Sequence, residues 1–146
     1  MPDECQLPDF NELGLLPPGL HTACFDVFRR KFGFNPKRQE MVDHGLKAVC
    51  IDLAKRGDVH RFFVGGSFVT QRLLPRNVNI YVLAPNSRNP FNWFIKLKSL
   101  EWLANYQVKC ELAIQGATGP GSEHDWQHHF GHELDGTPKG IVVLTF

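Results

Sequence analysis

A short helix is predicted after residue 22 by phenylalanines at helical spacing. Thr22 is a residue type that caps helices, and Gly33 ends the apolar pattern. The apolar positions between them are Phe25, Phe28 and Phe32. The residues before this segment carry prolines and little periodicity, so we expect an irregular arm over residues 1–20, laid on a single domain formed by residues 21–146.

Two longer helices are predicted where an Asn-Pro pair precedes a broad apolar face. The first begins at Asn35-Pro36 and continues to Gly57, and the second begins at Asn89-Pro90 and continues to about Tyr106. The apolar face of the first consists of Met41, Val42, Leu46, Val49, Cys50 and Leu53, and that of the second of Trp93, Phe94, Leu97, Leu100, Trp102 and Leu103.

Strand composition recurs between and after these helices. The predicted strands are residues 60–64, 78–83, 108–114 and 140–145. A Gly-rich loop over residues 116–121 and a histidine-rich stretch precede the last strand. This order predicts an α+β fold, a mixed sheet backed by helices with two of them at the N-terminal side.

The composition and charge of the chain exclude only a few classes of protein. The 146 residues carry a formal net charge of +1, which gives no overall electrostatic case for a nucleic-acid or membrane partner. The first residues lack the pattern of a signal peptide, and no stretch approaches the about 20 apolar residues of a membrane helix. We therefore expect a cytoplasmic protein. Its four cysteines form no Cys-x-x-Cys pair, so we expect reduced, unpaired thiols.

The most informative segment is a Gly-Gly-Ser turn between two predicted strands. Gly65, Gly66 and Ser67 follow the first strand, and Asn77 and Asn79 begin the next. A Gly-Ser turn between a strand and a short helix directs backbone N–H groups and a hydroxyl at one point, where a phosphate can bind. The segment is therefore a candidate anion site.

This segment resembles the polymerase-beta-like nucleotidyltransferase superfamily, whose signature is a Gly-Ser turn followed about ten residues later by Asp-x-Asp. Further segments are similar to a bacterial and phage nucleotidyltransferase-like family of uncharacterised function. They are Leu16 to His21, Phe32 to Arg38, Gly66 to Thr70 and Asp135 to Ile141. The resemblance thus extends, in order, from residue 16 to the C-terminal part of the chain.

The resemblance implies an enzyme that moves a nucleoside monophosphate from a nucleoside triphosphate to a protein or RNA acceptor. It implies Mg²⁺ or Mn²⁺ at the positions of Asn77 and Asn79, phosphate binding by Gly65, Gly66 and Ser67, and a third carboxylate on a later strand. Glu111 is our candidate for that third metal ligand and for assisting the nucleophile. Small members of the superfamily often belong to toxin–antitoxin or phage-defence modules.

The chain departs from the signature at both metal positions. Asparagine offers a neutral carbonyl oxygen, and each missing carboxylate removes several kcal/mol of attraction for a dication at about 4 Å and an effective dielectric of about 20. We therefore expect impaired transfer, in an inactive relative or an inactivated variant. The alternative from another class is a non-catalytic module that binds a nucleotide or a protein.

Plainer interpretations stand beside these. A Gly-Gly-Ser turn and an Asn-x-Asn strand start are also ordinary turn chemistry, and Glu111 is also consistent with a solvent-facing strand residue. Histidines 124, 128 and 132 are spaced for one helical face, but Gly131 weakens a helix, so we expect a solvated loop without structural metal. The basic cluster is interpreted as solvent-facing surface rather than a phosphate contact. Its members are Arg29, Arg30, Lys31, Lys37 and Arg38.

Overall fold

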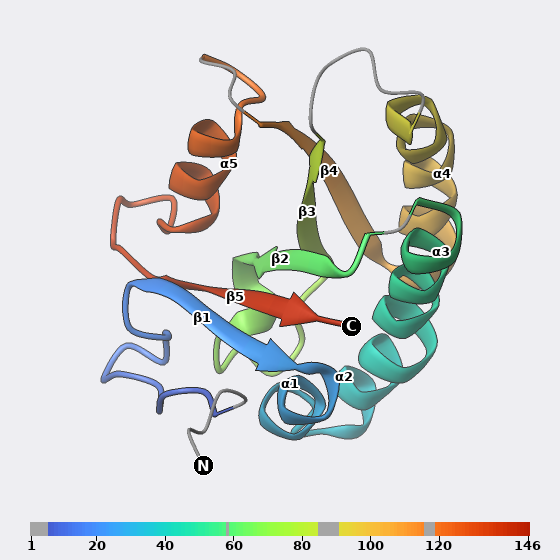
Figure 1. The fold of residues 1–146 in the computed structure, drawn as a ribbon. Coiled ribbons are helices and arrows are strands. Elements are labelled where there is room, and N and C mark those ends of the chain that lie inside the picture. The colour runs from blue at the N-terminus through green and yellow to red at the C-terminus, as the bar shows by residue number, and fades with distance from the viewer. Residues whose placement is uncertain (1–5, 58, 85–90, 116–118) are drawn as a thin grey trace.

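The computed structural model describes residues 6–57, 59–84, 91–115 and 119–146 (Figure 1). Within these ranges five strands form one mixed sheet in the order β1-β5-β2-β3-β4. The strands are β1 (Gly19–Cys24), β2 (Arg61–Gly65), β3 (Val78–Ala84), β4 (Val108–Ile114) and β5 (Gly140–Thr145). The two outer pairs, β1 with β5 and β3 with β4, are parallel, whereas β2 is antiparallel to both of its neighbours.

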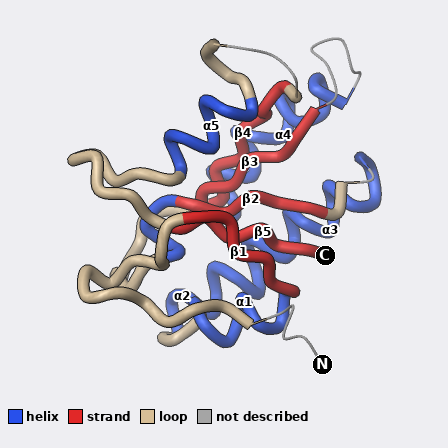
Figure 2. Tube along the Cα trace, turned by 60° about the vertical axis from the view of Figure 1, so that its left-hand side comes forward, coloured by secondary structure: helices blue, strands red, loops and turns tan. Residues whose placement is uncertain are grey.

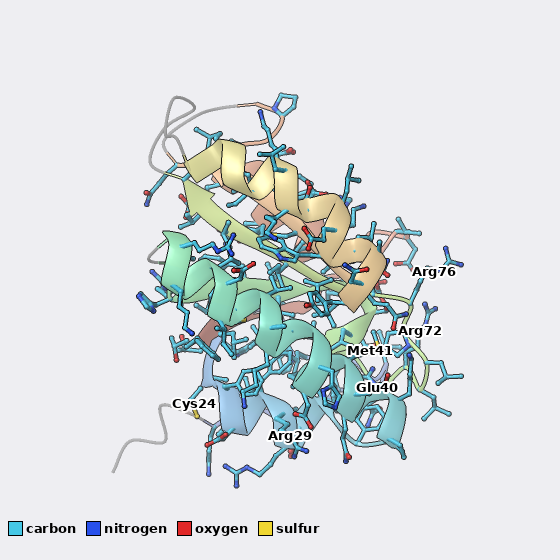
Figure 3. All side chains as sticks on the ribbon, turned by 90° about the vertical axis from the view of Figure 1, so that its right-hand side faces the viewer. Cys24, Arg29, Glu40, Met41, Arg72 and Arg76 are labelled. Carbon is cyan, nitrogen blue, oxygen red and sulfur yellow. The ribbon has the colours of Figure 1, made fainter. Side chains whose placement is uncertain are left out.

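One face of the sheet carries most of the helical residues. Its helices are α1 (Phe25–Phe32), α2 (Pro36–Glu40), the π-helical segment η1 (Met41–Leu46), α3 (Lys47–Gly57) and α4 (Phe91–Tyr106). Figure 3 looks onto this layer, in which α4, α3 and α1 lie one beside another. On the opposite face lies α5 (Glu123–Phe130), so the sheet is enclosed between two unequal layers (Figure 2).

The two faces build two apolar clusters. The larger one joins the helical layer to the sheet and contains fully buried residues such as Phe28, Leu53 and Ile80. The smaller one, beneath α5, consists of Phe63, Tyr81, Ala113, Phe130, Ile141 and Val143. Strands β2 and β5 contribute to both clusters, which explains their almost continuous apolar sequences, as expected of strands covered on both faces.

The predicted α+β class and the predicted strands are confirmed. The helix predicted from Asn35 to Gly57 is formed by α2, η1 and α3, and in α4 two residues of the predicted apolar face, Leu97 and Leu100, are exposed. Asn35 caps α2 by accepting a hydrogen bond from the Arg38 N–H at 2.9 Å, and Pro36 occupies the first turn as predicted. The predicted helix start at Asn89-Pro90 and part of the Gly-rich loop lie outside the described residues.

The prediction that Thr22 caps the first helix is wrong. Residues 19–24 form β1, in which Thr22 pairs with Val143, and α1 begins only at Phe25. Pairing with a strand about 120 residues away overrides the local capping preference, and no short-range pattern could show it. The last two residues of the predicted arm, Gly19 and Leu20, therefore belong to the sheet. In the described part of the arm, residues 6–18, Leu15 and Leu16 are buried.

No helix of the described residues is long and apolar enough to cross a membrane.

Candidate anion-binding cleft

The Gly-Gly-Ser turn leaves the sheet at the end of β2 and leads into the short 3-10 helix η2 (Gly66–Val69). Both glycines are required by close neighbours. A Cβ at Gly65 would lie 2.6 Å from Phe130 Cδ2 of α5, and a Cβ at Gly66 would lie 2.6 Å from Asn79 Nδ2. Gly66 also has φ +74°, a conformation that side chains disfavour. Gly66 therefore packs directly against the Asn79 amide, which leaves no room for a side chain at this turn position.

Asn79 lies directly across from the turn, because it pairs with Gly65 in the β2–β3 register. It is half-buried, and its Oδ1 atom is buried without a hydrogen-bond partner among the described residues. Asn77 immediately precedes β3 and is also half-buried. Because successive side chains of a strand point to opposite faces, residues 77, 79 and 81 share one face, the face covered by α5. The structure thus brings the predicted phosphate-binding turn and the second predicted metal position together.

Glu111 is on the predicted face but not beside Asn79. In the parallel β3–β4 register, Asn79 pairs with Lys109, and Glu111 pairs with Tyr81, two residues or about 7 Å further along. Neither Glu111 nor Asn77 is among the residues that line the cleft at the turn. The strand position next to Asn79 therefore presents a cation rather than a third carboxylate.

The turn opens into a cleft of about 780 Å³. Its walls come from the turn, from the following connection, from β3 and from α5 with the loop after it. The lining residues are Gly66, Ser67, Thr70, Arg72, Asn79, His128, His129, Phe130, His132, Glu133, Leu134, Gly136 and Lys139. We call this volume the main cleft.

Positive and titratable side chains predominate around the main cleft. Arg72, Lys139 and three histidines face it, and the lining holds one carboxylate, Glu133. That carboxylate accepts a hydrogen bond from Lys139 Nζ at 2.7 Å, and Lys139 is only 6 % exposed. The negative charge of Glu133 is thus matched before any ligand arrives. An amide oxygen and a paired carboxylate are a poor donor set for Mg²⁺ or Mn²⁺, so the residues present do not fit the metal that the resemblance implies.

The histidine-rich stretch is a helix, so the expectation of a solvated loop is wrong. Ser122 caps α5 by accepting a hydrogen bond from the Asp125 N–H at 3.1 Å, and Gly131 follows the last turn instead of interrupting the helix. His128 and His132 have ring centroids 4.3 Å apart, and His132 Nδ1 lies 2.8 Å from the His128 carbonyl. Within the described ranges, no three His, Cys, Asp or Glu side chains are grouped as metal ligands.

Arg38 supports the connection behind the cleft, a role that the sequence did not predict. It is fully buried, so the interpretation of this member of the basic cluster as solvent-facing surface is wrong, and it cannot reach a phosphate in the cleft either. Its guanidinium donates hydrogen bonds to the carbonyls of Phe32, Phe68, Thr70 and Arg72. Burial lowers the pKa of Arg38 to about 10, which leaves it cationic at neutral pH.

The remaining basic residues of that cluster have ordinary surface partners. Arg29 forms a two-pronged ion pair with Asp43, with Nε to Oδ1 at 2.7 Å and Nη2 to Oδ2 at 2.9 Å. Lys31 lies over the Phe10 ring, and Lys37 donates to Gln107. Arg72, labelled in Figure 3 on the connection between η2 and β3, lines the cleft, and sequence spacing did not single it out.

The buried thiols of Cys50 and Cys110 are not reactive groups. Burial raises the pKa of both Cys50 and Cys110, so neither is a reactive thiolate at neutral pH. Cys5 lies outside the described residues, and the expectation of four unpaired thiols stays a prediction.

Fold and cleft together define a small α+β domain with a glycine turn at the end of a central strand, beside a cleft lined by Arg72, Lys139 and three histidines. The chain belongs to a family of unknown function (DUF6932), which matches residues 8–145. No curated protein and no solved structure matches the chain.

Proposed function

We propose that the main cleft binds the phosphates of a nucleotide without a divalent metal ion. The observation that carries this proposal is the contact between Gly66 and Asn79. The turn carries no side chain at Gly66 and packs against the neutral Asn79 amide, at a position where a metal-dependent enzyme would need a carboxylate. The Ser67 hydroxyl at the same turn adds a donor that rotates to suit a phosphate oxygen.

The charges around the main cleft support an anion over a cation. Arg72 supplies the cation of the lining that Glu133 does not pair, because Lys139 is held by Glu133, and the histidines supply N–H donors in either protonation state. Within the cleft a dication would meet the neutral amide of Asn79 and a Glu133 carboxylate that Lys139 already pairs. The electrostatic preference therefore opposes the ion that nucleotidyl transfer would use, and favours the phosphate chain itself.

A further feature favours a nucleotide over a simple phosphate. The buried Oδ1 of Asn79 accepts hydrogen bonds and lacks a donor. An ionised phosphate offers only acceptors, whereas a sugar hydroxyl or a base amine offers a donor. A ligand with an anionic chain and sugar hydroxyls offers acceptors to the cationic rim and donors on the side of Asn79, and a nucleotide has this chemistry.

This proposal retains the nucleotidyltransferase resemblance at the level of the fold and of ligand class. The turn, the Asn-x-Asn segment and Glu111 occur in the expected order on β2, β3 and β4. Glu111 shares a face of the sheet with Asn79. With aspartates at positions 77 and 79, this face would support a second candidate function, the transfer of a nucleoside monophosphate to a protein or RNA acceptor.

The proposal is tested by isothermal titration with ATP in the presence of EDTA. We expect binding without metal, and we expect Gly66→Ala to weaken it by about tenfold or more, because the added Cβ meets the Asn79 amide. Gly119→Ala is the matched control. Gly119 has a similar φ of +82° but open space around the position of a Cβ.

A second pair of variants tests the charge argument. Arg72→Gln removes a cation that lines the cleft, and Arg76→Gln removes one from the same connection that is not part of the lining (Figure 3). We expect only Arg72→Gln to weaken ATP binding and to reduce its dependence on salt. If the wild-type chain binds no ATP, or binds it only with Mg²⁺, the proposal is wrong.

A further inference from the structure

A second hollow of about 300 Å³ adjoins the main cleft, and we call it the side pocket. It lies between α5 and the beginning of β1. Its lining consists of Pro18, Gly19, Leu20, His124, Gln127, His128, Gly131, His132, Pro138, Lys139 and Ile141. Three of these residues, His128, His132 and Lys139, also line the main cleft, so the two volumes share a boundary.

The side pocket differs from the main cleft in chemistry. Its lining contains no carboxylate, and Leu20, Ile141 and two prolines give it apolar surface. Leu20 is 45 % exposed although it belongs to a sheet strand. His124 and Gln127 project from α5 at the same place and offer planar polar groups. Apolar surface with a few hydrogen-bonding groups is typical of a pocket for a flat heterocycle.

The backbone around the side pocket is held firmly. Gly19 pairs with Gly140 in the β1–β5 register, and the Gly140 N–H donates to the Leu16 carbonyl at 3.0 Å. The Lys139 N–H donates to the Gly131 carbonyl at 2.9 Å, which joins the end of α5 to the start of β5. The boundary between the two hollows is therefore preformed, and Lys139 stands on it.

From this arrangement we propose that the side pocket holds the base of the nucleotide whose phosphates lie in the main cleft. The inference rests on the proposed function. Lys139, paired with Glu133, stands at the shared boundary between the phosphates and the base, Leu20 and Ile141 pack against the ring, and Gln127 and His124 hydrogen-bond its edge. The side pocket thereby turns a site for polyphosphate into a site for a nucleotide.

The experiment compares inorganic tripolyphosphate with ATP, GTP, CTP and UTP, all in EDTA, by isothermal titration. We expect at least one nucleotide to bind about tenfold more tightly than tripolyphosphate, the gain typical of an added pocket contact. Leu20→Gln, which keeps the charge unchanged, should abolish that advantage and leave tripolyphosphate binding unaltered. Leu97→Gln, at an exposed leucine of α4, is the control.

A second variant, in α5, tests whether the effect of Leu20→Gln comes from a disturbance of β1. His124→Ala changes an exposed helical residue that lines only the side pocket, and it should also reduce nucleotide affinity without changing tripolyphosphate affinity. If tripolyphosphate and all four nucleotides bind equally, the base pocket is refuted and the phosphate site stands. Equal losses for tripolyphosphate and nucleotide in both variants would likewise refute it. If none of the five ligands binds, the proposed function fails and this inference fails with it.

Discussion

The guanidinium of Arg38 donates a 2.9 Å hydrogen bond from Nε to the backbone carbonyl of Arg72, so a buried cation fixes the residue whose own side chain lines the main cleft. The same guanidinium also holds the carbonyls of Phe68 and Thr70. The connection after the Gly-Gly-Ser turn is thus shaped from beneath by α2. This explains how an irregular segment can present a defined surface to a ligand.

Replacement of Arg38 should be strongly destabilising. Arg38→Met would leave several buried carbonyls without donors, and we expect the free energy of unfolding to fall by about 3 kcal/mol or more. Arg30→Met, at an exposed position of α1, should change it by less than about 0.5 kcal/mol. Urea denaturation of both variants measures the difference. Equal stability of the two variants would show that the carbonyls find other partners.

The Arg29–Asp43 ion pair should make stability depend on acid. Hydrogen bonding from Arg29 is the main reason why the pKa of Asp43 is lowered from its usual 3.8. A carboxyl group whose pKa is lower in the folded state than in the unfolded state stabilises the fold at pH values above its unfolded-state pKa. This stabilisation is lost as the pH falls through its folded-state pKa. Asp43→Asn should therefore lower the melting temperature at pH 7 by a few degrees and make little difference near pH 2.

Asp9→Asn, at an exposed carboxyl of the N-terminal arm, is the control for that comparison. It should leave the melting temperature unchanged at both pH values. A deficit of Asp43→Asn that persisted undiminished in acid would assign the effect to packing instead of charge.

A separate prediction concerns metal binding at the positions of Asn77 and Asn79. Asn77→Asp with Asn79→Asp places two carboxylates near Glu111 on one face of the sheet, and should create Mn²⁺ or Mg²⁺ binding that the chain lacks as it stands. With ATP present, the double variant should gain a metal-dependent rise in melting temperature. Asn105→Asp, near the end of α4, should gain none. A folded double variant without this gain would refute the nucleotidyltransferase relationship at the site.

Chelation tests the histidine-rich helix. We expect EDTA to leave the melting temperature of the wild-type chain unchanged, because no structural metal is needed to hold α5. Differential scanning calorimetry before and after dialysis against EDTA provides the measurement. A fall in melting temperature that zinc restores would contradict this expectation and assign a metal to His124, His128 and His132.

Local signals in the sequence were sufficient for most elements. Asn35-Pro36, the alternating residues of β4 and the apolar run of β5 each specify their own structure, and the structure follows them. Residues 19–24 could not be assigned in this way. Their strand exists because β5 pairs with them, and that partner lies at the other end of the chain.

The candidate site was predictable in part for the same reason. The turn at Gly66 and the position of Asn79 belong to neighbouring strands, so their spacing in the sequence carried the geometry. The position of α5, which brings His128 to the main cleft, depends on the packing of Phe130 against Tyr81 and Phe63 on the sheet. The burial of Arg38 depends on carbonyls about 30 residues away, which a composition or period cannot reveal.

The place of β5 in the sheet bears on how the molecule is made. The strand begins at residue 140, yet it lies between β1 and β2 and joins them. A nascent chain that has not yet released this segment from the ribosome holds β1 apart from the β2–β3–β4 unit, and the walls of both hollows are incomplete. Assembly must therefore wait for synthesis of the central strand, and until then the unpaired hydrogen-bonding edges of β1 and β2 are open to chaperones or to mispairing with other chains.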